Sequence, residues 1–177
     1  MKIGLTGTMS VGKTSLVNAL KQLPEFKDYY FATERSKYLR DLGIPLNTDS
    51  TVRGQIIFMA ERSSELFREN LITDRSIIDV MAFTSLSKSI SVKDKQYLID
   101  CASTLIKEYD YIFYIDPKGT KIEDNGVRCI DEDYRYQVDK QIAYYLHKYS
   151  PHNLITISGP TEDRIEKIKE TLFPQYV

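Results

Sequence analysis

The stretch Gly7-Thr8-Met9-Ser10-Val11-Gly12-Lys13-Thr14 spells G-x-x-x-x-G-K-T, the pattern of a phosphate-binding loop. The short apolar run Lys2–Thr6 before it predicts a buried strand, and Leu16, Leu20 and Leu23 after it have helical spacing. In this order the loop amides and the positive end of the helix dipole can face a polyphosphate. The stretch therefore predicts an α/β fold that binds a nucleoside triphosphate, and a glycine turn that merely mimics the pattern is the alternative.

The loop and the first helical turn supply the predicted contacts to the nucleotide. Lys13 can reach the outer phosphates, and the Thr14 hydroxyl can ligate Mg²⁺. ATP is the expected nucleotide, with GTP left open. The predicted nucleotide-binding residues of this segment are Gly7, Met9, Ser10, Val11, Gly12, Lys13, Thr14 and Ser15.

Apolar runs alternate with amphipathic stretches along the rest of the chain, which predicts one domain over 1–177 with a parallel sheet and helices on both faces. The expected strands are Lys2–Thr6, Tyr30–Thr33, Leu71–Thr73, Tyr111–Ile115 and Leu154–Ser158. The expected helices are Lys13–Leu23, Val52–Glu69, Val92–Glu108, Glu132–Lys148 and Glu162–Leu172.

Composition limits the partners that the chain can have. The net charge is −1 over 177 residues, which disfavours a polynucleotide substrate because proteins that bind a long phosphate backbone usually have a basic surface. No apolar run approaches the roughly 18 residues of a membrane span, and the first residues enter a strand instead of forming a signal peptide. Cys101 and Cys129 have no motif spacing and are expected to be buried free thiols. These features predict a cytoplasmic protein without a membrane segment.

Acid–arginine pairs follow two of the expected strands: Glu34-Arg35 after the second and Asp74-Arg75 after the third. Ligands of parallel α/β sheets gather at the carboxyl ends of strands. Glu34 is therefore predicted to act as general base on an acceptor hydroxyl or to hold a water on Mg²⁺, with Arg35 beside it at the acceptor. Asp74 is predicted to bind Mg²⁺ directly or through water, and Arg75 to grip a phosphate or orient the acceptor. Solvated charges and a structural Asp–Arg pair are the alternatives.

Further candidates lie on the intervening helices and loops. Asp79 is equally consistent with an acceptor ligand and with helix capping or packing. Arg53 and Gln55, on an expected helix, are candidate contacts of the acceptor. Gln55 offers a donor and an acceptor that could read a base edge, although most helical glutamines have no such role. The polar segment of about 117–135 is predicted as a lid that brings Arg128 and Arg135 to the triphosphate, or else as a solvated loop whose arginines pair with acids. The turn at Gly159 could flank the nucleotide base.

Together these segments resemble the P-loop nucleoside and nucleotide kinases, most closely the NadR-like domains of ribosylnicotinamide kinase type. The resemblance runs from Met1 to about Leu172, and it implies a five-stranded parallel sheet of order 2-3-1-4-5. Gln55 lies where deoxynucleoside kinases present a base-reading glutamine, and Arg128 and Arg135 look like lid arginines. Asp74 stands where those kinases usually carry Glu, and Glu34 is followed by Arg instead of Pro, so the acceptor is left open.

The expected activity is therefore transfer of the ATP γ-phosphoryl group to a small nucleoside-like or nucleotide acceptor. One alternative is a nucleotide-hydrolysing regulatory module, although the D-x-x-G and N-K-x-D motifs of a GTPase switch are missing from the corresponding positions. Another is a kinase that acts on a base or end within a nucleic acid. The sequence leaves the oligomeric state open, a homodimer included.

Overall fold

A computed structural model of the chain describes residues 1–33, 35–120 and 131–174. Within them, five strands form one parallel sheet of order β2-β3-β1-β4-β5. This confirms the strand order that the resemblance implies. The strands are β1 (Lys2–Thr6), β2 (Tyr30–Ala32), β3 (Leu71–Asp74), β4 (Tyr111–Ile115) and β5 (Leu154–Ile157).

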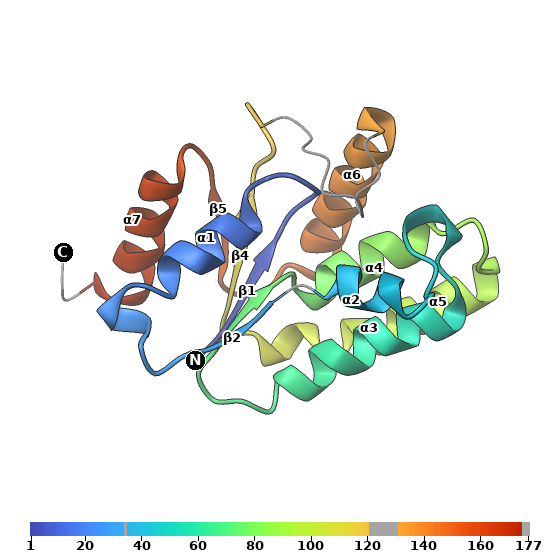
Figure 1. Cartoon of the computed structure of the whole chain (residues 1–177), viewed down its shortest axis with the longest axis horizontal. Coiled ribbons are helices and arrows are strands. Elements are labelled where there is room, and N and C mark those ends of the chain that lie inside the picture. The colour runs from blue at the N-terminus through green and yellow to red at the C-terminus, as the bar shows by residue number, and fades with distance from the viewer. Residues whose placement is uncertain (34, 121–130, 175–177) are drawn as a thin grey trace.

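Helices cover both faces of the sheet (Figure 1). One face is covered by α1 (Lys13–Leu20) and α7 (Thr161–Leu172), which pack against each other. The other carries α3 (Val52–Glu65), α4 (Ile77–Leu86), α5 (Val92–Ser103) and α6 (Glu132–Tyr149), with α4 contacting the other three. The short helix α2 (Ser36–Asp41) follows β2, and the 3₁₀ turns are η1 (Pro24–Phe26), η2 (Asn47–Asp49) and η3 (Ile106–Glu108).

Side chains along β1 point alternately to the two faces of the sheet, each of which has its own hydrophobic core. Ile3 and Leu5 are buried in the cluster beneath α1 and α7. Gly4 and Thr6 face the other side, as the period of two of a strand requires. A Cβ on Gly4 would lie 2.9 Å from the Tyr109 ring, so glycine lets this ring and the start of α4 approach the sheet closely. Tyr109 in turn accepts a hydrogen bond at its hydroxyl from the Ile77 amide, 3.2 Å away.

The buried helix α4 is missing from the elements that the sequence predicts. Its residues are apolar on most sides, and seven of its ten are buried, so it lacks the one-sided apolar stripe of a surface helix. The signal that could have found it is the capping box, in which Ser76 and Asp79 bond each other's backbone amides. The expected helices from Lys13, Val52 and Val92 begin correctly but end earlier, at Leu20, Glu65 and Ser103.

Cys101 is a free thiol, but it is only partly buried, because it lies on α5 at a shallow surface groove; Cys129 lies outside the described residues. Over residues 1–33, 35–120 and 131–174, none of the helices combines the length and the apolar character that crossing a membrane would need.

Candidate functional site

The phosphate-binding loop connects β1 to α1 at the carboxyl end of the sheet. Its side chains anchor it in both cores, since Met9 packs on the α4 and α6 side and Val11 on the α1 and α7 side. The backbone turns through the left-handed region at Ser10 (φ 57°) and at Gly12 (φ 85°). Glycine fits position 12 for two reasons: it adopts the left-handed backbone readily, and a Cβ there would lie 3.1 Å from the Arg164 guanidinium. Ser15, in the first helical turn, is exposed.

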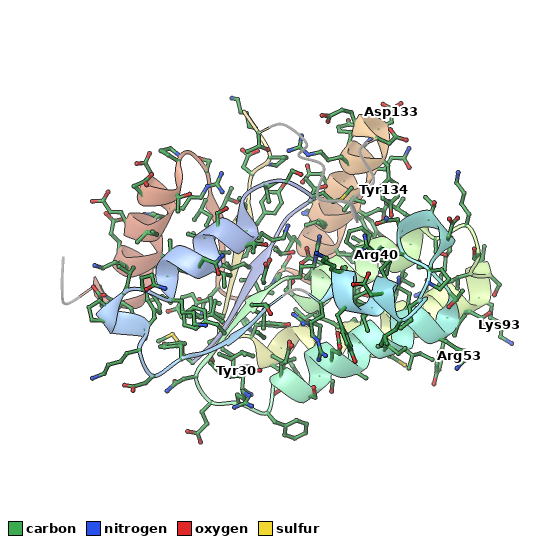
Figure 2. The ribbon with its side chains drawn as sticks, in the orientation of Figure 1. Tyr30, Arg40, Arg53, Lys93, Asp133 and Tyr134 are labelled. Carbon is green, nitrogen blue, oxygen red and sulfur yellow. The ribbon has the colours of Figure 1, made fainter. Side chains whose placement is uncertain are left out.

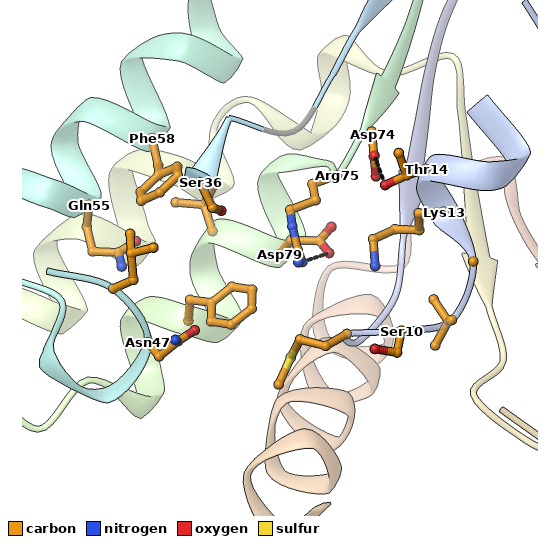
Figure 3. Close-up of a pocket in the computed structure, with 16 residues that line it drawn as sticks. Ser10, Lys13, Thr14, Ser36, Asn47, Gln55, Phe58, Asp74, Arg75 and Asp79 are labelled. Atoms are coloured by element: carbon orange, nitrogen blue, oxygen red, sulfur yellow. Dashed lines mark hydrogen bonds and ion pairs between the residues drawn. The ribbon is translucent and has the colours of Figure 1, made fainter. Parts of the chain in front are cut away.

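Lys13 lies within the loop and is 6% exposed. Its Nζ donates hydrogen bonds to the carbonyls of Gly7 and Thr8, each at 2.6 Å. The ammonium group is therefore held at the centre of the loop, on the pocket side (Figure 3). A buried cation surrounded by the backbone of a glycine loop is suited to a polyphosphate.

Thr14 and Asp74 meet across the pocket. The Thr14 hydroxyl donates to Asp74 Oδ2 at 2.6 Å, and Asp74 is 1% exposed at the end of β3 (Figure 3). The sheet register places β3 directly beside β1, so the acid and the loop come from adjacent strands. A hydroxyl and a carboxylate oxygen are the ligand types that Mg²⁺ prefers, and the pair fits a Mg²⁺ that also contacts phosphates and waters. Both residues predicted for the metal therefore lie together.

Arg75 has an unusual backbone for a long side chain, with φ at 93°. Two hydrogen bonds hold this turn: the Arg75 amide donates to the Leu5 carbonyl at 3.1 Å, and Arg62 Nη1 donates to the Arg75 carbonyl at 3.1 Å. Arg62 is buried and also bonds Glu65 at 2.8 Å. Burial raises the pKa of Glu65, against the opposing charge of Arg62. The strained turn points the Arg75 side chain into the pocket, over the Phe83 ring.

Asp79 connects the loop to α4. Its carboxylate accepts a hydrogen bond from the Thr6 hydroxyl at 2.6 Å and one from the Ser76 amide at 2.9 Å. It also forms an ion pair with Arg75 at 3.3 Å. Of the two interpretations that the sequence left open, the capping role is the one that the contacts display. Asp79 nevertheless lines the pocket, so its predicted contact with an acceptor stays a prediction.

Two buried arginines, on α6 and α7, donate hydrogen bonds to the backbone of the phosphate-binding loop. Arg135 on α6 donates to the Met9 carbonyl at 3.1 Å, and Arg164 on α7 donates to the Val11 carbonyl at 2.6 Å. Arg135 also bonds Thr120, through both its carbonyl and its hydroxyl. Burial lowers the pKa of Arg164. Because these carbonyls bond to guanidinium groups, they point away from the pocket, and two positive charges lie beneath the phosphate end.

Arg164 belongs to none of the motifs in the sequence, and Arg135 is predicted from the sequence to lie on a lid. In the structure Arg135 is 7% exposed and lies against the loop, so any contact between it and a nucleotide stays a prediction. The signal for Arg164 was a basic residue in the otherwise acidic first turn of α7, an unfavourable position for a cation unless a specific partner holds it. Gly159 lies in the turn before α7, at φ 83°, and a Cβ there would lie 3.2 Å from the Asp163 carboxylate.

The far end of the same pocket has a different character (Figure 3). Gln55 is 3% exposed, and its Oε1 accepts a hydrogen bond from the buried Thr84 hydroxyl at 3.1 Å. Apolar and aromatic side chains line this end, together with the polar side chains of Ser36 and Asn47. The lining residues that the sequence analysis did not single out are Ser36, Leu46, Asn47, Phe58, Val80 and Phe83.

Two predicted acceptor contacts do not line this pocket. Arg35 pairs with Glu61 at 3.3 Å and lies over the Tyr38 ring, with its side chain 48% exposed. Arg53 is exposed on the outer side of α3 (Figure 2). Gln55 lies two residues further along the helix and faces inward instead, because neighbouring residues of a helix point in different directions. The predicted base Glu34 and the predicted lid residue Arg128 lie outside the described residues.

Comparison with known proteins gives the family. A family model described as an AAA domain matches residues 2–164, and the chain belongs to this family. None of the curated proteins matches the chain in sequence.

Solved structures share the fold at low sequence identity. The deoxyadenosine kinase from M. mycoides with bound dCTP is 18% identical, with a TM-score of 0.64 over 99% of this chain and 98% of that one. The NadR protein in complex with NR is 17% identical, with a TM-score of 0.74 over 95% of this chain but 50% of that one. The YorR protein from Bacillus subtilis in complex with phosphorylated GDP is 16% identical, with a TM-score of 0.54. The fold is thus that of P-loop kinases, as the sequence resemblance implied.

Proposed function

We propose that the chain is an ATP-dependent kinase that transfers the γ-phosphoryl group to a hydroxyl of a small nucleoside-like or nucleotide acceptor. One observation carries the proposal. A single continuous pocket joins the phosphate-binding group of Lys13, Thr14 and Asp74 to the aromatic end that contains Gln55 (Figure 3). Phosphoryl transfer needs a donor and an acceptor side by side in one water-poor pocket, and this arrangement supplies both places. The structural neighbours with bound dCTP, NR and phosphorylated GDP support the same class of ligand.

The phosphate end supplies most of what the reaction requires. The loop amides and the start of α1 offer hydrogen-bond donors and a positive dipole to the triphosphate. Lys13 exchanges its carbonyl contacts for phosphate oxygens and stabilises the charge that develops as the bond to the leaving phosphate loosens. Thr14 and Asp74 would hold Mg²⁺, which when bound neutralises charge on the β- and γ-phosphates.

Arg75 lies between the two ends of the pocket and has the charge and fork geometry to orient the transferred group. Its strained backbone and its pairing with Asp79 fix where the guanidinium points, which lowers the entropy lost on binding. Glu34 is the proposed general base on the acceptor hydroxyl, and Arg128 is the proposed cation that approaches the triphosphate from the lid.

The acceptor end is suited to a planar group. Gln55 presents an amide edge, and Phe58 offers aromatic surface at the same end of the pocket (Figure 3). Phe83 lines the same pocket, with its ring 5.1 Å from the Arg75 guanidinium. Aromatic walls with one or two fixed polar groups are typical of a site that binds a heterocyclic base. We therefore propose a base-bearing acceptor with its hydroxyl directed toward Arg75 and the loop.

The test is a transfer screen with γ-³²P-labelled ATP, and separately labelled GTP, in the presence of Mg²⁺. Acceptors include nucleosides, nucleoside monophosphates, nicotinamide riboside and single-stranded oligonucleotides. Label on a small acceptor supports the proposal and names the substrate. Label released only as inorganic phosphate would contradict it in favour of a hydrolase, and label on the oligonucleotide alone would favour an end kinase. The Lys13→Ala variant is the blank for contaminating kinases.

A further inference from the structure

The segment that closes the acceptor end is held rigidly. It is the 3₁₀ turn η2, whose first residue, Asn47, has a left-handed backbone with φ at 55°. The Ser50 amide donates to the Asn47 carbonyl at 3.2 Å, which closes the turn. Two hydrogen bonds then fix η2 to the end of α4: the Lys88 amide donates to the Thr48 carbonyl at 2.7 Å, and the Ser87 hydroxyl donates to the Ser50 carbonyl at 2.6 Å.

The Asn47 side chain lies on the pocket side of this rigid turn. It lines the same end as Gln55, away from Lys13 and Thr14 (Figure 3). Between Asn47 and the other described residues there is no side-chain hydrogen bond, and the residues that line the pocket with it include Leu46 and Phe83. A carboxamide at an apolar wall gains most when a ligand supplies both of its hydrogen-bond partners.

The left-handed backbone alone does not account for asparagine here. Asparagine tolerates this conformation, but glycine adopts it with less strain. The chain uses glycine at a nearby left-handed position, Gly43 with φ at 79°, where a side chain would meet no atom within 4 Å. At position 47 it uses asparagine, and the added side chain lies in the pocket.

We propose that Asn47 is a specificity-determining residue that hydrogen-bonds the heterocyclic base of the acceptor. This inference rests on the proposed kinase function. Asn47 and Gln55 then present two separate carboxamides from η2 and α3, each able to donate and to accept. The substrate class that this pair fits is a nucleoside-like acceptor whose base carries hydrogen-bonding groups on two edges.

The experiment uses the acceptor found in the transfer screen and three variants of the chain. Asn47→Gly keeps the left-handed backbone and removes the amide. Asn47→Asp keeps the shape but replaces the donor with an acceptor. Ser150→Gly is the control, because Ser150 is another left-handed polar residue, at φ 40°, but it caps the C-terminal end of α6 and is not among the residues that line the pocket. For each variant, kcat/KM is measured for the parent acceptor, for analogues with one base nitrogen replaced by C–H, and for deoxy-sugar analogues.

We expect Asn47→Gly to lower kcat/KM for the parent acceptor about 5- to 10-fold, the value of one hydrogen bond, with the KM for ATP unchanged. With the wild-type chain, the base analogue that lacks the nitrogen bonded by Asn47 should show the same loss of kcat/KM. With Asn47→Gly, this analogue should show no further loss relative to the parent acceptor, as interacting partners do in a double-mutant cycle. Asn47→Asp shifts preference toward bases that present a donor at this edge. Ser150→Gly behaves as the wild type.

Two results overturn the inference and leave the kinase proposal standing. In the first, the wild type transfers phosphate and Asn47→Gly discriminates among base analogues equally well. In the second, the loss follows the sugar analogues instead of the base analogues. Absence of transfer by the wild type to every acceptor overturns both proposals together.

Discussion

The two ends of the pocket are built from different kinds of contact. At the phosphate end, one continuous stretch and the end of the adjacent strand place Lys13, Thr14 and Asp74; Lys13 bonds backbone carbonyls of the loop, and Thr14 bonds the Asp74 carboxylate. At the acceptor end, side chains from η2, α3 and α4 meet, with Gln55 and Thr84 separated by 29 residues in sequence. The first end is therefore determined by a loop motif and by the pairing of β1 with β3, and the second by how helices pack. If this division is real, a substitution at one end of the pocket should change the binding of one substrate and leave that of the other unchanged.

The largest effect is expected for Lys13→Ala. The variant removes the cation that faces the phosphates, and loss of one such charge-stabilising group typically lowers kcat by roughly 100- to 1000-fold. Acceptor binding, measured by calorimetry in the absence of ATP, should stay unchanged because the base contacts lie at the other end. Turnover close to the wild type in a variant that is folded by circular dichroism would remove this loop from the reaction.

The reverse experiment disturbs the acceptor end. Gln55→Leu removes a buried amide whose loss leaves polar groups of the acceptor unpaired, so the KM for the acceptor should rise roughly tenfold or more while that for ATP stays the same. Gln96→Leu, which changes an exposed glutamine on α5, is the matched control. An equal rise in both KM values would show that the two ends are not separable.

This division also explains what could be predicted from the sequence. The pairing of Thr14 with Asp74 follows from a loop motif and from an acid at a strand end, both of which act through backbone position. The sheet order follows from the family resemblance that these motifs support. Phe58 and Phe83 have no such signal, because an aromatic residue on a helix looks the same whether it faces a core or a pocket. Asn47 has none either, because asparagine is common in turns whether or not its side chain faces a pocket. Arg53 and Gln55 are two residues apart, and only the packing of α3 decides which of them faces inward.

Arg164 tests how much the phosphate end depends on a residue outside the loop motif and the paired strands. It reaches the loop from α7, 153 residues away, and bonds the Val11 carbonyl at 2.6 Å. Arg164→Gln should weaken nucleotide binding about 5- to 10-fold, because a charge-assisted hydrogen bond is lost and a loop carbonyl is freed to turn inward. Arg164→Lys should recover part of the affinity through its charge. The readout is the Kd of a fluorescent ATP analogue, and an unchanged Kd in Arg164→Gln would confine this residue to packing.

The smallest effect is expected at Thr84, which acts on the acceptor only through Gln55. Its one hydroxyl proton faces two acceptors, Gln55 Oε1 at 3.1 Å and the Val80 carbonyl at 2.7 Å, which share it. Thr84→Val has nearly the same shape and removes this bond, and Thr84→Ser keeps it. We expect Thr84→Val to lower kcat/KM for the acceptor about two- to fivefold, because Gln55 then samples orientations that do not match the base.

The comparison between valine and serine separates orientation from packing. Serine deletes the methyl group and so disturbs the core, yet it should keep the acceptor selectivity of the wild type while lowering Tm. Valine restores the packing but leaves the buried Gln55 oxygen without its partner, and it should blur discrimination between bases of opposite hydrogen-bonding pattern. If instead selectivity follows Tm across the two variants, the Thr84 hydroxyl has no part in orienting Gln55, and the acceptor end is set by shape alone.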